Sequence, residues 1–245
     1  MKKNGFTLIE ILAVIVIIGI VGTIAVVSVS QNILSSRDST IVNLAKNYME
    51  SARTMRAEEN LQYNPKKDEV VVIPCDQING TEIEHKDTTG YGDVLKDYCY
   101  VGIKNDGNDK YSYYMTLVDD TYHMLIGKEY NSVSEDDILD GSENLTGVSR
   151  ISSPFNSFGV KYDNNTYNIK AIRVKYSATY QDGGTKTATL YGYYTNDSGS
   201  NMNAHIKGTI NELDSFISNS DKTRKINGRD YTIVDYEVMY IVLDN

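Results

Sequence analysis

One carboxylate near the amino terminus stands beside a long apolar stretch. Glu10 directly precedes the run from Ile11 to Val29, which contains no ionisable side chain, and Arg37 is the next charged residue. Moving a carboxylate into hydrocarbon costs about 2.5–3.5 kcal/mol by insertion scales. A carboxylate in this place needs a cation as its partner or a functional reason to be there. Glu10 is therefore the first candidate functional residue.

The apolar run is the element that must position this carboxylate. A membrane-spanning helix needs about 20 mostly apolar residues, and the stretch from Phe6 to Val29 meets this length. Lys2 and Lys3 precede it, so the amino terminus is expected to stay cytoplasmic and the remainder to be translocated. The alternative is a cleaved secretory signal, for which Ala25–Val27 and Ser28–Ser30 are weak cleavage sites. Cleavage there leaves the carboxylate unexplained.

The first ten residues resemble the class III signal of type IV pilins and pseudopilins. The matching features are a basic leader, Gly5 followed by Phe6, small and aliphatic residues, and then Glu10 ahead of the apolar run. The resemblance implies cleavage after Gly5 by a membrane prepilin peptidase and N-methylation of the new terminal Phe6. Residues 1–5 are then the leader, and residues 6–30 serve first as a transmembrane anchor and later as the core of a fibre.

The same resemblance gives Glu10 a role. Cleavage creates a cationic amine on Phe6, one helical turn before Glu10, and in such families the Glu pairs with the terminal amine of a neighbouring subunit. Breaking a buried ion pair costs about 3–5 kcal/mol, although an intact pair need not add net stability. We therefore expect Glu10 to set the register of subunits in the fibre. The alternative is a carboxylate that reaches the lipid headgroups.

The helix is expected to continue past the lipid to about Glu59, with residues 31–60 as its amphipathic part. From Ser39 onward this part has no Gly or Pro, and its apolar residues recur at spacings of three and four, as on a helix half buried against a head. These residues are Ile41, Leu44, Ala45, Tyr48, Met49, Ala52 and Met55. Many pilins carry a proline in the apolar segment, whereas this chain has only Gly19 and Gly22 to loosen its helix.

The remainder of the chain has the composition of a β-rich head. From about residue 61 it is rich in Tyr, Thr, Val, Asp, Asn and Gly, with the alternation and turn signals of strands. We expect a strand at 70–73, hairpins over 111–126 and 167–195 with a Gly-Gly turn in the second, a short helix over 206–217 and a last strand over 231–243. The predicted fold class is α+β, a long helix packed on an antiparallel-sheet head in a pilin-like layout.

The head is long for a single pilin head. A break near Ser149–Pro154 divides it into two predicted modules, residues 61–148 and 149–245. Each half offers hairpins, and the second also offers its own helix. No internal repeat supports the division, so a single elaborated head remains the alternative.

Two cysteines, Cys75 and Cys99, lie in the first half of the head. An even count in a chain exported to an oxidising compartment favours a disulfide, worth about 3 kcal/mol by the chain-entropy model. Free thiols or metal ligands are the alternative. Many pilins bracket a carboxy-terminal region with their disulfide, whereas both cysteines here lie far upstream. The receptor-binding role of that region is therefore not transferred to this pair.

No pattern in the sequence predicts catalysis, a cofactor or a metal. His85, His123 and His205 are scattered and lack the spacing of a zinc site. Residues 134–143 concentrate five carboxylates, but without the alternating oxygen ligands of a calcium loop, so they are interpreted as a solvated loop. We therefore expect a protein that is not an enzyme.

The formal net charge of −9 limits the partners. Binding to nucleic acid needs a positive surface, so it is not expected from this subunit alone. Tyrosines in the strands are either a platform for a host or surface ligand or ordinary strand residues. They are Tyr111, Tyr113, Tyr114, Tyr176, Tyr180, Tyr191, Tyr193 and Tyr194.

The sequence thus predicts a structural subunit of a type IV pilus, and the large head favours a minor or adhesive pilin. The resemblance implies other pilin subunits, prepilin peptidase and a pilus assembly platform with its ATPase as partners. It also implies a single-pass location in the inner, cytoplasmic membrane with the head outside, followed by transfer to a surface pilus. Two alternatives stay open: a pseudopilin of a type II secretion or DNA-uptake machine, and an anchored surface-binding protein that never polymerises.

Overall fold

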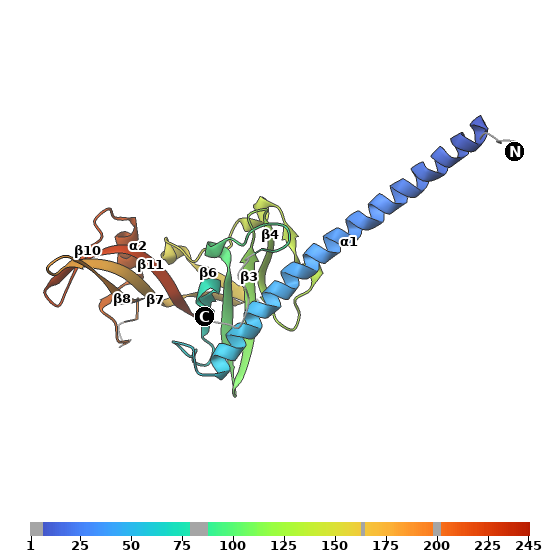
Figure 1. Ribbon diagram of the computed structural model, residues 1–245. Coiled ribbons are helices and arrows are strands. Elements are labelled where there is room, and N and C mark those ends of the chain that lie inside the picture. The colour runs from blue at the N-terminus through green and yellow to red at the C-terminus, as the bar shows by residue number, and fades with distance from the viewer. Residues whose placement is uncertain (1–6, 79–87, 163–164, 198–201) are drawn as a thin grey trace.

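The computed structural model describes residues 7–78, 88–162, 165–197 and 202–245, and it consists of a long helix and a β-rich head (Figure 1). The helix α1 (Leu8–Ala57) begins after its N-cap Thr7 and ends at Ala57, with Glu58 as its C-cap. Its first part projects away from the head, whereas its last turns lie against the sheet. At 1.5 Å per residue, 50 residues span about 75 Å, so the predicted long helix is confirmed.

The head is built on one sheet, which contains 11 strands among the described residues. Its order is β5-β4-β3-β2-β1-β11-β7-β8-β9, with β10 paired to β11 and β6 paired to β7. All the pairs are antiparallel except β8 with β9, which confirms the predicted α+β class. The strands are β1 (Val70–Pro74), β2 (Tyr100–Gly107), β3 (Lys110–Val118), β4 (His123–Glu129), β5 (Leu139–Asp140), β6 (Gly159–Tyr162), β7 (Asn165–Gln181), β8 (Thr185–Thr195), β9 (Ile206–Gly208), β10 (Thr223–Ile226) and β11 (Arg229–Asp244).

Both faces of the central strands are covered. In β1, Val71 and Ile73 belong to the apolar core beneath α1, whereas Val70 and Val72 belong to a second core on the opposite face. The second core also takes in apolar side chains of the helix α2 (Ile210–Ser218). A strand that is buried on both faces reads as a continuous apolar run, and this explains why the sequence from Val70 to Ile73 shows no alternation.

The packed half of α1, residues 41–57, lies on β2 and β3 through the predicted apolar stripe. Ile41, Ala45, Met49 and Ala52 have no exposed surface, and their neighbours in the core are apolar side chains of both strands. Spacings of three and four place these residues on one side of a helix. The stripe predicted from the sequence is thus the surface that holds the helix to the head.

The helix expected over residues 206–217 begins later than predicted. Ile206–Gly208 forms the short strand β9 beside Gly192–Tyr194, and α2 starts only at Ile210. The start is fixed by a capping box, in which the Thr209 hydroxyl accepts from the Glu212 amide while the Glu212 carboxylate accepts from the Thr209 amide. The stretch from 206 to 208 was misread because its apolar spacing continues that of the helix.

The boundary predicted between the two head modules falls in the segment between β5 and β6. The sheet itself continues from one predicted module to the other, because β1 pairs with β11 and Val70 lies opposite Leu243. Figure 1 shows α2 and β10 at the end of the head that is remote from α1. The division into residues 61–148 and 149–245 stays a prediction about how the two halves fold.

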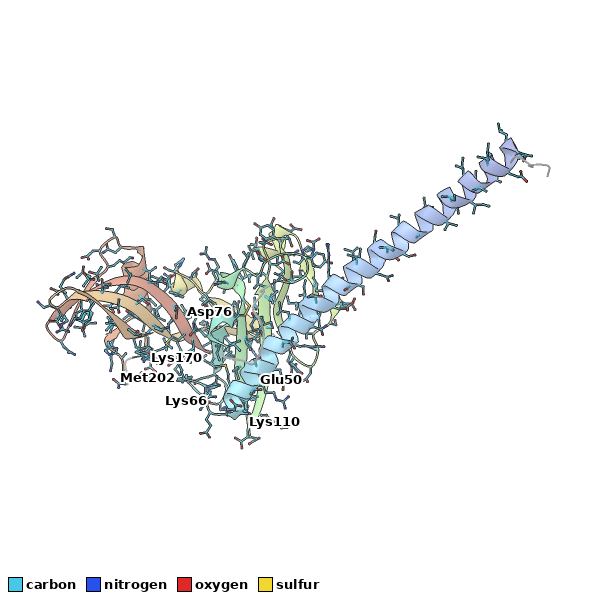
Figure 2. The ribbon with its side chains drawn as sticks, viewed as in Figure 1. Glu50, Lys66, Asp76, Lys110, Lys170 and Met202 are labelled. Atoms are coloured by element: carbon cyan, nitrogen blue, oxygen red, sulfur yellow. A yellow bond between two sulfur atoms is a disulfide. The ribbon has the colours of Figure 1, made fainter. Side chains whose placement is uncertain are left out.

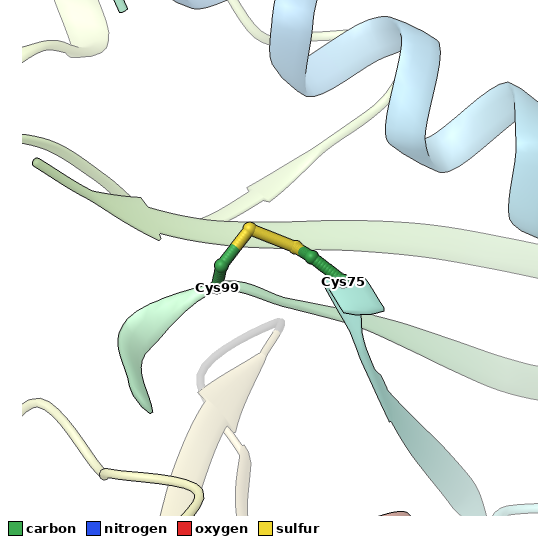
Figure 3. The surroundings of a disulfide bond; sticks show 2 residues. All are labelled: Cys75 and Cys99. Atoms are coloured by element: carbon green, nitrogen blue, oxygen red, sulfur yellow. A yellow bond between two sulfur atoms is a disulfide. The ribbon is translucent and has the colours of Figure 1, made fainter. Parts of the chain in front are cut away.

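Cys75 and Cys99 are joined by a disulfide in the structure (Figure 3). The bond connects the residue after β1 to the residue before β2, where the Cys75 amide also donates to the Cys99 carbonyl at 3.0 Å. Both cysteines are buried in the core beneath α1. The disulfide therefore joins the neighbouring ends of β1 and β2 inside the core against which α1 packs.

Candidate functional site

The predicted assembly residue Glu10 lies at the free end of α1, in the first helical turn. Its Oε2 accepts hydrogen bonds from the Thr7 amide at 2.7 Å and from the Thr7 hydroxyl at 2.8 Å. In return, the Thr7 hydroxyl accepts from the Glu10 amide at 3.3 Å. This is a capping box, which satisfies amide groups that have no partner inside the helix. Gly5 and Phe6, the predicted processing site, lie outside the described residues.

The capping box could have been predicted from the sequence, but only the charge of Glu10 was considered in interpreting it. A Thr followed three residues later by a Glu, just before an apolar run, is the usual signature of a helix start. Thr7 thus has a role that the sequence analysis missed. It holds the Glu10 carboxylate at the level of the first turn, directly beside the peptide that follows Phe6.

The stem, residues 8–34 of α1, exposes its apolar side chains on every side (Figure 2). The large apolar side chains described between Leu8 and Leu34 are 47–83% exposed, with Leu8 the most exposed. Among the described residues, α1 is the one helix that is long and apolar enough to cross a membrane. Fully burying one such side chain is worth about 1.5–3 kcal/mol. The stem therefore requires lipid or other apolar partners around it.

Two hydroxyl groups within the stem are satisfied by the helix itself. The Thr23 hydroxyl donates to the Ile20 carbonyl at 2.8 Å, and the Ser30 hydroxyl donates to the Val26 carbonyl at 2.9 Å. An unsatisfied polar group costs several kcal/mol in lipid, so these bonds suit a hydrocarbon environment. The helix also passes without interruption through Gly19, at which an added Cβ would meet no atom within 4 Å.

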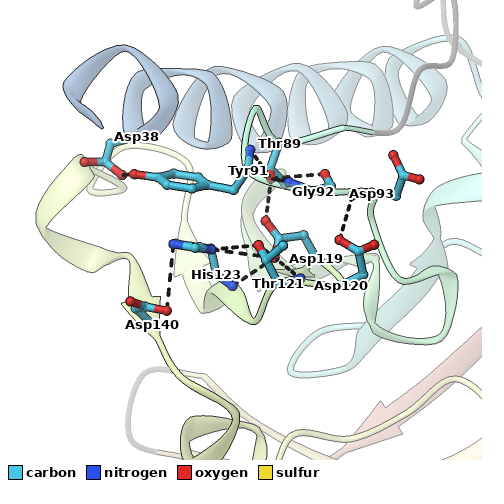
Figure 4. A network of polar contacts seen from close by, with 10 residues as sticks. All are labelled: Asp38, Thr89, Tyr91, Gly92, Asp93, Asp119, Asp120, Thr121, His123 and Asp140. Carbon is cyan, nitrogen blue, oxygen red and sulfur yellow. Dashed lines mark hydrogen bonds and ion pairs between the residues drawn. The ribbon is translucent and has the colours of Figure 1, made fainter. Parts of the chain in front are cut away.

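The junction between the stem and the head is tied by Tyr91 (Figure 4). Its hydroxyl donates to Asp38 at 2.9 Å, the Arg37 guanidinium lies 5.2 Å from its ring centre, and its ring stacks on His123 with the centres 3.7 Å apart. Burial and the hydrogen bond to Asp38 raise the pKa of Tyr91 to about 12. The phenol therefore keeps its proton and continues to donate to the helix at neutral pH.

His123 is held in turn by carboxylates. Its Nδ1 lies 3.8 Å from Asp119 and its Nε2 lies 3.7 Å from Asp140. Asp119 is fully buried and accepts from the amides of Thr121 and His123, at 3.0 and 2.9 Å, as well as from the Thr89 hydroxyl. Figure 4 shows Thr89 from the loop before β2, Asp119 and Thr121 from the turn between β3 and β4, His123 from the start of β4, and Asp140 from β5 lying close together. His123 is thus part of the support for the stem.

His205 takes no part in this network. His205 lies beside Tyr191 and accepts from its amide through Nδ1 at 3.0 Å, and His85 lies outside the described residues. Within the described ranges, the structure forms no group of three or more His, Cys, Asp or Glu side chains that could hold a metal ion.

The acidic segment 134–143 is mostly exposed, in keeping with the solvated loop expected from the sequence, and its residues Glu135–Asp137 contact α1. Glu135 accepts from the Ser39 hydroxyl of the helix. Lys128 donates to Asp137 at 2.7 Å, and this hydrogen bond holds the pKa of Asp137 below its usual range. Asp137 also accepts from the Ser134 amide at 2.9 Å. The segment thus forms a second support for the helix near the junction.

Most of the strand tyrosines do not form a binding platform. Tyr113, Tyr114, Tyr176, Tyr193 and Tyr194 are at most 8% exposed and pack in the two cores. Alternation in the sequence could not reveal this, because both faces of the sheet are covered. The half-buried members, Tyr111, Tyr180 and Tyr191, each carry a stacked arginine, at 4.1, 4.7 and 5.1 Å from the ring centre.

Comparison with known families bears on the amino terminus. Residues 1–26 match the family model of the prokaryotic N-terminal methylation motif, the class III signal of type IV pilins. The amino terminus is therefore that of a pilin- or pseudopilin-type precursor, a class that prepilin peptidase processes and that assembles with other pilin subunits. The match includes Glu10 and most of the stem and leaves the head outside it. Comparisons with curated proteins and with solved structures give no match for the chain.

Proposed function

We propose that this chain is the precursor of a minor, adhesive subunit of a type IV pilus. Prepilin peptidase removes residues 1–5, Phe6 becomes the N-methylated terminus, and the stem holds the subunit in the cytoplasmic membrane with its head outside. An assembly platform and its ATPase supply the work of extraction, since the sequence carries no nucleotide-binding motif. The subunit then enters a surface fibre, in which the stem joins other stems and the head is displayed.

The observation that best supports this proposal is the exposed apolar surface of the stem. Its apolar surface is exposed on all sides, and it continues without a break into the helix that the head packs against. Such a stem is soluble in lipid and is equally suited to a bundle of identical stems, because both surround it with apolar groups. The methylation motif at residues 1–26 supports the same interpretation.

Glu10 supplies the register of this assembly. Its carboxylate is fixed in the first turn by both donors of Thr7. A neighbouring subunit at the correct axial offset brings its Phe6 amine to this charge, whereas a wrong offset leaves a carboxylate and an amine unpaired in an apolar surrounding. A lone buried charge of this kind costs about 3–5 kcal/mol.

The experiment that tests this proposal compares Glu10→Gln with Glu50→Gln in the native cells. Glu50 lies on the same helix at its exposed face, paired with Arg53 at 3.5 Å. We expect intact-mass measurements on all three chains to show loss of residues 1–5 and an added methyl group on Phe6. Sheared fibres should contain the unaltered chain and Glu50→Gln equally, and at least tenfold less Glu10→Gln.

Three results would contradict the proposal. Normal incorporation of Glu10→Gln would remove the register role. A processed chain that never enters sheared fibres would point to a pseudopilin or to an anchored binding protein. An unprocessed amino terminus, or cleavage between Ala25 and Ser30, would exclude the pilin pathway altogether.

A further inference from the structure

A groove lies beside the last turns of α1, between the helix, β3 and the residues that follow β4, and its volume is about 260 Å³. Met49 and Tyr113 are buried at its inner side, whereas Arg53 and Asn131 are exposed at its edge. It belongs neither to the free end of the stem nor to the junction around Tyr91. The proposed assembly therefore leaves this groove without a use.

Arg56 is fixed within the groove before any ligand arrives. Its Nε donates to the Tyr113 hydroxyl at 2.9 Å, and its guanidinium carbon lies 4.1 Å from the centre of the Tyr111 ring. The first contact sets the direction of the guanidinium and the second supports its plane. A guanidinium fork matches a carboxylate through two parallel hydrogen bonds, and little rotational freedom remains to be lost when one binds.

The contacts of Arg56 differ from those of arginines that are neutralised within the chain. Arg150 pairs with Asp97 at 3.1 Å, and Arg229 pairs with Asp182 at 3.6 Å. Arg56 is held by phenols instead, and in the described part of the chain no carboxylate lies within ion-pair distance of it. A half-buried cation held in this way is prepared for a carboxylate from outside.

The remaining groups of the groove surround this cation with hydrogen-bonding partners. Glu129 and Asp109 supply carboxylates, Asn131 supplies an amide, and Tyr130 supplies a half-buried ring. Carboxylates accept hydrogen bonds from hydroxyl groups, and the negative face of an aromatic ring attracts C–H bonds. A cation for one carboxylate, acceptors for hydroxyls and an aromatic face together match an acidic sugar.

We propose that this groove binds a uronic acid unit of an acidic saccharide, with its carboxylate on Arg56, its ring against Tyr130 and its hydroxyls on Glu129. The inference rests on the display of the head outside the cell in the proposed function. An acidic peptide is the competing occupant, for example segment 134–143 of a second copy. It fits less well, because Glu129 and Asp109 repel additional carboxylates.

The test is a calorimetric titration of the mature, full-length chain in detergent micelles with glucuronic acid and with glucose, its uncharged counterpart. We expect glucuronic acid to bind at least tenfold more tightly, which corresponds to about 1.4 kcal/mol. Arg56→Gln should abolish this preference, and Tyr130→Leu, which keeps an apolar side chain, should weaken the binding of both sugars. Arg224→Gln is the matched control, since Arg224 also stacks on a ring, 3.9 Å from the centre of Phe216, and it should bind as the unaltered chain does.

Equal binding of the two sugars, no binding of either, or an undiminished preference in Arg56→Gln would overturn the proposal. A synthetic peptide of residues 134–143 that binds more tightly than glucuronic acid, and that loses this binding in Arg56→Gln, would also overturn it and assign the groove to contacts between copies. The titration needs no fibre. A negative titration therefore leaves the Glu10 experiment standing, and a failure of fibre incorporation leaves the titration valid.

Discussion

The two halves of α1 form one unbroken helix, but they meet different surroundings. From Leu8 to Leu34 the helix exposes apolar side chains on every side, whereas from Ile41 to Ala57 it buries one stripe and exposes polar residues elsewhere. In the stem, the Thr23 and Ser30 hydroxyls donate to carbonyls of the same helix. The packed half is joined to the head by the sheet, and the helix just before it, at Asp38 and Ser39, is joined by Tyr91 and Glu135.

This difference separates two functions along a single helix. The packed half has already gained the free energy of burying its apolar stripe, so it contributes to the folding of the head. The apolar side chains of the stem are still exposed, so burying each large one in lipid or against another stem would contribute about 1.5–3 kcal/mol. Folding of the head and association through the stem are therefore encoded in different residues, and substitutions should affect one without the other.

The largest expected effect comes from placing the same charge in each half. Ala45 has no exposed surface, so Ala45→Glu forces a carboxylate into the apolar core and should lower the free energy of unfolding of the head by at least about 4 kcal/mol. Ala25 is exposed on the stem, so Ala25→Glu should leave that free energy unchanged and instead reduce membrane insertion and fibre incorporation. Chemical denaturation in detergent and quantification of membrane fractions measure the two effects.

Asn47→Glu is the control for this pair, because Asn47 is exposed on the packed half. It should change the free energy of unfolding by less than about 0.5 kcal/mol. If Ala25→Glu destabilised the head as strongly as Ala45→Glu does, the two halves would not be separable and the comparison would fail.

The sequence predicted those features that depend on local patterns. The stripe on α1 follows from spacings within one helix, and the turn between β7 and β8 follows from Gly183 and Gly184, which both adopt positive φ. Pairings between distant segments left no such pattern. Nothing local indicates that Val70 lies opposite Leu243 or that Tyr91 stacks on His123. The same holds for the candidate functional residues. Glu10 could be predicted because the residues beside it form a recognisable pattern, whereas the groove at Arg56 is built from residues that are far apart in the sequence.

A smaller effect is expected at Glu69, which fastens the chain between α1 and β1 to the sheet. Glu69 is 4% exposed and accepts from Lys170 at 2.8 Å, from the Lys66 amide at 2.9 Å and from the Tyr63 hydroxyl at 2.8 Å. Burial works to raise the pKa of Glu69, but these hydrogen bonds outweigh it and lower the pKa below its ordinary value. A carboxyl with a lowered pKa adds stability above its unfolded pKa of about 4.3, and this is lost as the pH falls through the folded pKa.

Glu69→Gln should therefore lower the free energy of unfolding by about 1–3 kcal/mol at neutral pH, because hydrogen bonds to a charged group are lost. It should also flatten the decline of stability between neutral and acidic pH, which denaturation at a series of pH values measures. The exposed Glu50, changed to Gln, should keep the pH dependence of the unaltered chain. An identical pH dependence in Glu69→Gln and the unaltered chain would mean that this carboxylate does not fasten the chain between α1 and β1 to the sheet.

The smallest effect should arise at the junction, where Tyr91→Phe removes one hydrogen bond to Asp38 and keeps the ring stacked on His123. The expected loss is about 0.5–1.5 kcal/mol, and hydrogen exchange should quicken for the helix amides near Asp38 but not for those of the stem. Tyr122→Phe is the control, because Tyr122 lies in the same turn as His123 and its side chain is exposed. If exchange near Asp38 stayed unchanged in Tyr91→Phe, the hydrogen bond of Tyr91 would not hold the helix at the junction. The contact between Ser39 and Glu135 would then be what holds it there.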